Sequence, residues 1–188
     1  MNIGLVLFAI SVIWLGSEIV LARVTHSKQA GNSLDRSSLR LLWTVIVVSI
    51  VLANFVTVLR VGSFGNGSTV YPVIGIVLIV CGLALRWVAI LSLKRQFTVD
   101  VSIVEGHRII SEGIYRHIRH PAYTGSLVSF FGLGFCFSNY LALLIVFVPI
   151  CGAFLHRVKI EERVLVEAFG NEYVQYRSST KRLIPGVY

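Results

Sequence analysis

The chain has 188 residues, of which 55% are hydrophobic and 14% are charged, and its formal net charge is +8. Soluble domains average roughly 45–50% apolar and about 25% charged residues, so a water-soluble globule is excluded: lipid must cover the outside of this fold. The basic residues are dispersed between apolar stretches instead of forming one stripe, which argues against nucleic acid as a partner.

Three segments are long and apolar enough to cross a bilayer as helices: 3–22, 39–59 and 70–93. A crossing helix needs about 20 apolar residues, and unpaired backbone is not tolerated in lipid. No Lys or Arg precedes the first segment and no small-residue cleavage site follows it. We therefore expect a retained span and not a signal peptide.

A fourth apolar stretch, residues 123–156, is too long for one span and is interrupted by Ser138 and Asn139. It predicts a tight helical hairpin, which brings the total to five spans. Small residues recur at i, i+4 and i+7 along the first leg, at Gly125, Ser129 and Gly132, and this spacing predicts close contact with another helix.

The connections between the spans differ in their content of Lys and Arg. Four lie in residues 23–40, one in 60–69, five in 94–122 and six in 157–188, with none before the first span. Alternation through five spans places the three rich segments on one side, which the positive-inside rule assigns to the cytoplasm.

Two cytoplasmic segments are polar enough to build a site. The first, residues 94–121, contains glycine turn signals, and the second begins at Arg157 and continues as an amphipathic helix that Gly170 ends. We expect them to close over a pocket whose floor is formed by the third, fourth and fifth spans. Such a pocket suits a water-soluble cofactor that meets a lipid-borne acceptor.

The predicted fold is therefore an all-α integral membrane protein with five transmembrane helices, a cytoplasmic cofactor-binding loop and a C-terminal helix. We expect one domain over residues 1–188, with two N-terminal spans in 1–69 and a catalytic core in 70–188. The three cysteines lie inside apolar stretches and show no CxxC or Cys/His spacing, so no metal site is predicted.

Two runs of residues resemble a known family. The first reads Gly106-His107-Arg108-Ile109-Ile110, then Gly113-Ile114-Tyr115, then Arg119-His120-Pro121-Ala122-Tyr123-Thr124-Gly125. It resembles the signature GHxLxxxGxYxxxRHPxYxG of the isoprenylcysteine carboxyl methyltransferase and phospholipid methyltransferase superfamily. The second run agrees with that family: Arg157-x-x-x-Glu161-Glu162, then Phe169-Gly170-x-Glu172-Tyr173-x-x-Tyr176.

The resemblance implies methyl transfer from S-adenosylmethionine at a membrane-embedded site. Carried over position by position, the cofactor-binding residues would be Asp100, His107, Arg108, Ile109, Ile110, Tyr115, Arg119, His120, Pro121, Ala122 and Glu161. The family often has Gln where Asp100 stands. Arg157 would bind the acceptor, and Arg157 and Glu162 are the candidate catalytic residues.

The chemistry of the acceptor decides which residues are needed. A carboxylate, as in an isoprenylcysteine, requires no general base and can be held by the planar guanidinium of Arg157. A phenol or an amine must lose a proton, and Glu162 or a histidine is then the candidate base. We favour the carboxylate. The short chain resembles prokaryotic members of the family, which predicts a prokaryotic cytoplasmic membrane as its location.

Two other functions compete with this one. Membrane sterol and steroid reductases have a similar C-terminal half and bind NADPH, whereas a non-catalytic membrane adaptor would bind no cofactor. Arg86 lies within the third span, where a charge is a functional hypothesis by default. Snorkelling of its side chain to the cytoplasmic surface explains it equally well.

Overall fold

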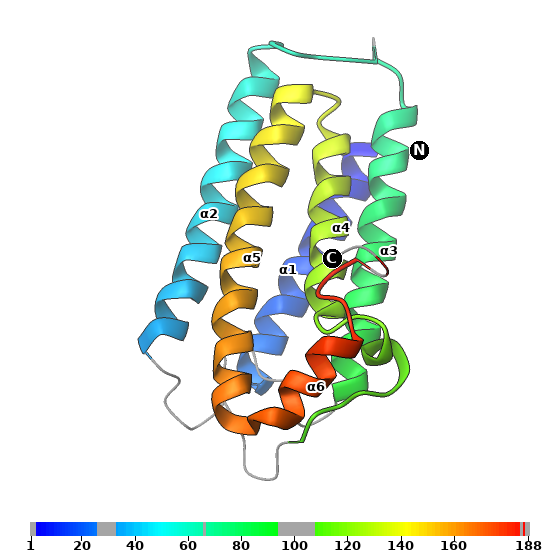
Figure 1. Cartoon of the computed structure of the whole chain (residues 1–188). Helices are drawn as coiled ribbons and strands as arrows, with labels where there is room; N and C mark the ends of the chain where they lie inside the picture. Colours follow the sequence, from blue (N-terminus) through cyan, green and yellow to red (C-terminus); the bar gives the residue numbers. More distant parts are fainter. Residues whose placement is uncertain (1–2, 26–32, 66, 94–107, 185, 187–188) are drawn as a thin grey trace.

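The computed structural model describes residues 3–25, 33–65, 67–93, 108–184 and 186, and the regular structure in these ranges is helical apart from two isolated bridges. The long helices run side by side, and a short helix crosses one end of them (Figure 1). In chain order the helices are α1 Ile3–Thr25, α2 Ser33–Val58, α3 Val70–Leu93, a 3₁₀ helix Gly113–Arg116, α4 Pro121–Cys136, α5 Tyr140–Phe169 and α6 Asn171–Ser179.

Four of these helices, α1, α2, α3 and α5, are long and apolar enough to cross a membrane. The predicted all-helical class is thereby confirmed. The 16 residues of α4 extend about 24 Å at 1.5 Å per residue, which is short of the roughly 30 Å hydrocarbon core. The count of five spans therefore stays a prediction.

Helices α3 and α4 pack backbone against backbone. A Cβ atom built on Gly82 would lie 2.5 Å from the carbonyl oxygen of Gly125, and one built on Gly75 would lie 2.5 Å from that of Gly132. Real Cβ atoms do not approach so closely, so only glycine fits at these crossings. The close helix contact predicted from the small residues of the hairpin is confirmed, and its partner is α3.

The turn between α4 and α5 lies where the sequence places it, at Ser138 and Asn139. Asn139 is fully buried, and its side chain accepts a hydrogen bond from the Ala142 backbone N–H at 3.0 Å, which caps α5. The same side chain donates to the Val61 carbonyl at 2.7 Å and so holds the connection between α2 and α3 against this turn.

Helix α5 departs from the expectation that a new helix begins near Arg157. It is one helix of 30 residues, about 45 Å long at the usual rise, and it therefore extends well beyond a hydrocarbon core of about 30 Å. Its last turns carry Arg157, Glu161 and Glu162. Gly170, with a φ of +56°, ends it as predicted, and α6, which was not expected, begins at once.

The C-terminal tail runs parallel to the segment that precedes α4. The Arg119 N–H donates to the Lys181 carbonyl at 2.8 Å, and the His120 N–H donates to the Arg182 carbonyl at 3.0 Å. One turn later the Thr124 hydroxyl donates to the Leu183 carbonyl at 2.8 Å. The backbone of the Arg119-His120 pair is thus fixed by a segment about 60 residues further along the chain.

Candidate active site

A cavity of about 470 Å³ begins beside the start of α4 and extends between the long helices. This volume lies within the range of small-molecule sites. Polar side chains line one part of the cavity, among them Arg108, Arg119, His120, Glu161 and Tyr173. Apolar side chains line the rest, among them Trp14, Ile46, Ile50, Phe130 and Leu133. The predicted floor of three spans is incomplete, because α1 and α2 supply much of the apolar wall.

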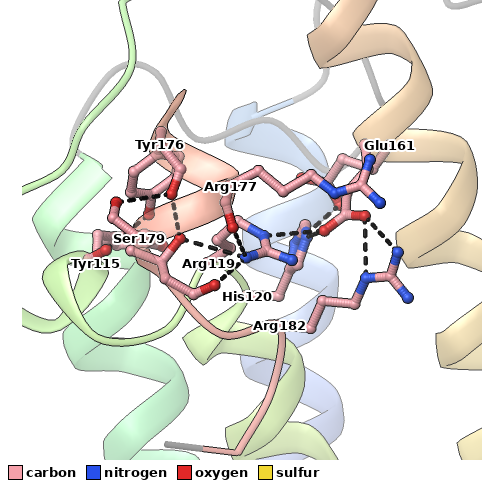
Figure 2. Close-up of polar contacts among 10 residues, drawn as sticks. Tyr115, Arg119, His120, Glu161, Tyr176, Arg177, Ser179 and Arg182 are labelled. Atoms are coloured by element: carbon pink, nitrogen blue, oxygen red, sulfur yellow. Dashed lines mark hydrogen bonds and ion pairs between the residues drawn. The ribbon is translucent and has the colours of Figure 1, made fainter. Parts of the chain in front are cut away.

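Arg119 is the centre of the polar part (Figure 2). Its Nε donates to Glu162 Oε1 at 3.0 Å, and its Nη1 donates to the carbonyls of Arg177 and Thr180, the first at 3.0 Å. The side chain is 6% exposed. Arg119 therefore ties the start of α4 to α5 and to the end of α6, because its guanidinium donates to acceptors on both.

Glu162 was a candidate general base, and the structure places it among arginines. One carboxylate oxygen accepts from Arg119, and the other accepts from Arg182 Nε at 3.0 Å, with Arg182 Nη2 at 2.9 Å. The side chain is 4% exposed and is absent from the residues that line the cavity. Its geometry is that of a residue that positions its neighbours.

Three buried polar atoms at this end of the cavity have no hydrogen-bond partner in the described part of the chain: His120 Nε2, Glu161 Oε2 and the Tyr173 hydroxyl. His120 lies 3.7 Å from Glu161 and 3.6 Å from Glu162, too far for a hydrogen bond. All three residues line the cavity. Unpaired buried polar groups cost free energy, and a ligand in the cavity would pair them.

Arg157 lines the cavity from α5 and is 2% exposed. Its Nε donates to the Tyr123 hydroxyl at 3.2 Å, and its Nη1 donates to the Ser38 hydroxyl at 3.0 Å. The Tyr123 ring in turn stacks on His120, with ring centroids 5.6 Å apart. Neutral hydroxyls thus orient this guanidinium, and its planar fork matches the geometry of a carboxylate.

The sequence-predicted residues are distributed as follows. Those that line the cavity are Arg108, Ile109, Ile110, Tyr115, Arg119, His120, Ala122, Arg157 and Glu161. Pro121 is fully buried in the first turn of α4, and Glu162 is buried beside the cavity. Asp100 and His107 lie outside the described residues.

Sequence reasoning missed Tyr123, Tyr173, Tyr176 and Ser126, which also line the cavity. The two α6 tyrosines stood in the second motif, so their spacing was the available signal. Burial raises the pKa of the Tyr176 hydroxyl to about 12, and burial together with the nearby Glu162 and Glu161 carboxylates raises the pKa of Tyr173. Both hydroxyls therefore stay protonated and can donate hydrogen bonds.

Arg86 does not snorkel, because it binds Glu18 on α1. Its Nε and Nη2 donate to the two carboxylate oxygens at 2.8 Å each, and its Nη1 donates to the Ser126 hydroxyl at 3.0 Å. Both charged side chains line the cavity, at 11% and 17% exposure. Sequence analysis gave Arg86 no partner, since nothing local indicates that residues 68 positions apart form a pair.

The fold and the site define a polytopic helical membrane protein with a ligand cavity that is polar at one end of the helices and apolar between them. The sequence profile described as the isoprenylcysteine carboxyl methyltransferase (ICMT) family matches residues 74–167. The chain belongs to the ICMT family. The match contains most of the cavity's polar residues and stops before α6 and the tail.

Curated relatives agree with this assignment. The chain is similar to protein-S-isoprenylcysteine O-methyltransferase B of Arabidopsis thaliana, with 31% identity over 60% of this chain and 58% of the relative. It is also similar to a probable protein-S-isoprenylcysteine O-methyltransferase of Oryza sativa subsp. indica, with 28% identity over 93% of this chain and 91% of the relative. The chain thus spans under two thirds of the first relative's length. These relatives are eukaryotic, so a prokaryotic source stays a prediction.

A solved structure supports the fold. The eukaryotic intramembrane Ras methyltransferase, isoprenylcysteine carboxyl methyltransferase, superposes with a TM-score of 0.66 at 21% identity, over 95% of this chain and 64% of that one. Because this likeness includes α1 and α2, the two N-terminal helices belong to the shared fold. The protein is therefore an integral, multi-pass membrane protein.

Proposed function

We propose that the protein transfers a methyl group from S-adenosylmethionine to a lipophilic, membrane-borne acceptor that carries a carboxylate of the isoprenylcysteine type. One observation carries this proposal: a single cavity joins three unpaired buried polar atoms, on His120, Glu161 and Tyr173, to an apolar region between membrane helices. A polar cofactor and a lipid can therefore meet in it. The family and the names of its curated relatives point to the same reaction.

The residues at the polar end fit the cofactor. S-adenosylmethionine has an ammonium, a carboxylate, ribose hydroxyls and an adenine, and it supplies an electrophilic methyl group when bound. Glu161 accepts from the ammonium or a ribose hydroxyl, while His120 and Arg108 donate to oxygens. The flat and apolar surfaces of the site are formed by Tyr115, Ile109, Ile110 and Ala122. Asp100 and His107 remain proposed members on the strength of the motif.

Arg157 binds the acceptor carboxylate in this proposal. Its burial excludes water from the ion pair, and the Tyr123 and Ser38 hydroxyls hold the guanidinium in one orientation. A carboxylate nucleophile has no proton to lose, so the transfer needs no base. That agrees with the place of Glu162, whose two oxygens are occupied by Arg119 and Arg182. Glu162 then serves to position Arg119 and His120.

The acceptor chain lies in the apolar part of the cavity, and the reaction takes place at the cytoplasmic face. Trp14 of α1 packs on Phe130 of α4 with ring centroids 4.9 Å apart, and both line this part. The Lys and Arg residues concentrated at the cavity's polar end support the cytoplasmic orientation. In this proposal residues 1–188 act as one membrane domain.

A transfer assay tests the function. Purified protein in phospholipid nanodiscs is incubated with methyl-labelled S-adenosylmethionine and N-acetyl-S-farnesylcysteine, and methyl ester formation is measured. We expect label in the organic extract that base hydrolysis releases as methanol. Arg157→Ala should raise the acceptor KM and leave the cofactor Kd unchanged. Absence of base-labile label from this carboxylate acceptor would overturn the carboxylate assignment.

A further inference from the structure

The tyrosine at position 173 differs from the other tyrosines of the site in what its hydroxyl contacts. Tyr173 lies in the first turn of α6, is 2% exposed and lines the cavity, and its hydroxyl has no partner among the described residues. The Tyr176 hydroxyl donates to the Tyr115 carbonyl at 2.7 Å, and the Tyr115 hydroxyl donates to the Ala89 carbonyl at 3.3 Å. Those two hydroxyls support the fold, and that of Tyr173 does not.

Burial of an unpaired hydroxyl is unfavourable, because the group loses its hydrogen bonds to water and gains none in return. A phenylalanine at position 173 would fill the same space without this cost. A side chain that keeps such a hydroxyl inside a cavity is typical of a ligand contact, because the ligand supplies the missing partner. The burial that raises the pKa of this phenol also keeps it a donor.

The neighbours of Tyr173 indicate the kind of partner. The Glu161 carboxylate and the His120 imidazole line the same end of the cavity, and each has an unpaired buried atom. A carboxylate accepts, a phenol donates, and an imidazole does either. This mixed set fits a ligand with both donor and acceptor groups, such as an amino acid or a ribose, better than a purely anionic group.

We propose that Tyr173 is a further cofactor-binding residue, whose hydroxyl donates a hydrogen bond to an oxygen of S-adenosylmethionine beside Glu161. The inference rests on the proposed function and extends the site to α6, beyond the residues to which the family resemblance gives a cofactor-binding role. The acceptor oxygen belongs either to the cofactor's carboxylate or to its ribose. Either oxygen would accept the same hydrogen bond, and titrations with S-adenosylhomocysteine and with 5′-methylthioadenosine distinguish the two positions.

The test is a titration of the full-length protein, in detergent, with S-adenosylhomocysteine, and a thermal unfolding measurement without ligand. Tyr173→Phe should weaken binding about three- to tenfold, the effect of one hydrogen bond, and should leave the unliganded Tm unchanged or higher. Tyr176→Phe should lower the unliganded Tm, since the Tyr115 carbonyl loses its donor. Tyr140→Phe, at a position 60% exposed and outside the cavity, should change neither quantity.

A second titration uses 5′-methylthioadenosine, which lacks the amino-acid end. Weakening by Tyr173→Phe of both ligands places the contact at the ribose, and weakening of S-adenosylhomocysteine alone places it at the carboxylate; either result supports the proposal. Unchanged affinity, or an unliganded Tm lowered as by Tyr176→Phe, overturns it. Failure of the unaltered protein to bind S-adenosylhomocysteine overturns the proposed function, and this inference with it.

Discussion

Two buried groups of charges lie against the same cavity, and they are built differently. Arg119, Glu162 and Arg182 form a cluster in which each carboxylate oxygen and several backbone carbonyls are paired; it joins α4, α5 and the tail (Figure 2). Glu18 and Arg86 form an isolated pair between α1 and α3, with the Ser126 hydroxyl as its one added partner among the contacts described.

The two arrangements indicate different roles for the two groups. The cluster fixes the backbone and side chains that present His120 and Glu161, so it supports the cofactor end. The pair holds α1, a helix in which Leu21 is the one buried side chain among those described. Figure 1 shows α1 crossing behind the other helices. Because α1 is a wall of the apolar part of the cavity, the pair supports the acceptor end.

The largest expected effect comes from removing the centre of the cluster. Arg119→Ala leaves Glu162 with Arg182 and with His120 at 3.6 Å, and it removes the donor to two backbone carbonyls. Loss of one partner from a buried pair costs about 3–5 kcal/mol, so we expect a large fall in Tm in detergent. The control is Arg177→Ala, an exposed arginine whose contribution here is its backbone carbonyl. Equal Tm values for the two variants would show that the cluster does not support the fold.

Single and double substitutions of the Glu18–Arg86 pair should have different effects on the acceptor KM. Glu18→Leu leaves the Arg86 charge uncompensated between membrane helices, which is costly, and should raise the acceptor KM while the cofactor Kd stays unchanged. The double variant Glu18→Leu, Arg86→Leu removes both charges, and apolar replacement of a buried pair is often neutral. We therefore expect the double variant to recover most of the KM. A double variant worse than the single one would mean that Arg86 itself contacts the acceptor.

Substitution of the two adjacent glutamates should give the smallest effects, and each substitution should change mainly one quantity, either the ligand affinity or the Tm. Glu161→Gln should weaken S-adenosylhomocysteine binding about tenfold with little change in Tm, because Glu161 has an unpaired atom in the cavity. Glu162→Gln should mainly lower Tm, since it removes the charge between two arginines. Calorimetry and thermal unfolding of both variants check this, and the reverse pattern would exchange the roles assigned to them.

The apolar pattern was enough to predict the helices, the turn at Asn139 and the close packing by Gly125 and Gly132, because these depend on local sequence and on the membrane. The motif predicted most of the polar residues that line the cavity. The continuity of α5 was missed, because the change from an apolar to an amphipathic pattern near Arg157 suggests a boundary where the helix in fact continues. The boundary at Gly170 was visible because a positive φ favours glycine.

The contacts that sequence reasoning missed are those between distant segments. Arg86 could not be given its partner, because Glu18 lies on another helix, and periodicity says which face of a helix is polar and not which helix it meets. The same holds for the tail, whose backbone pairs with Arg119 and His120. Tyr173 was visible in the motif, but its unpaired hydroxyl appears only once α6 is placed over the cavity.

The central claim is that the polar end of the cavity holds S-adenosylmethionine. Calorimetric titration of the unaltered protein in detergent with S-adenosylhomocysteine, and separately with NADPH, tests it most directly. We expect one equivalent of S-adenosylhomocysteine to bind, no heat from NADPH, and weakened binding in the His120→Ala variant. Binding of NADPH alone would contradict the account in favour of a reductase, and binding of neither would favour a membrane adaptor without a cofactor.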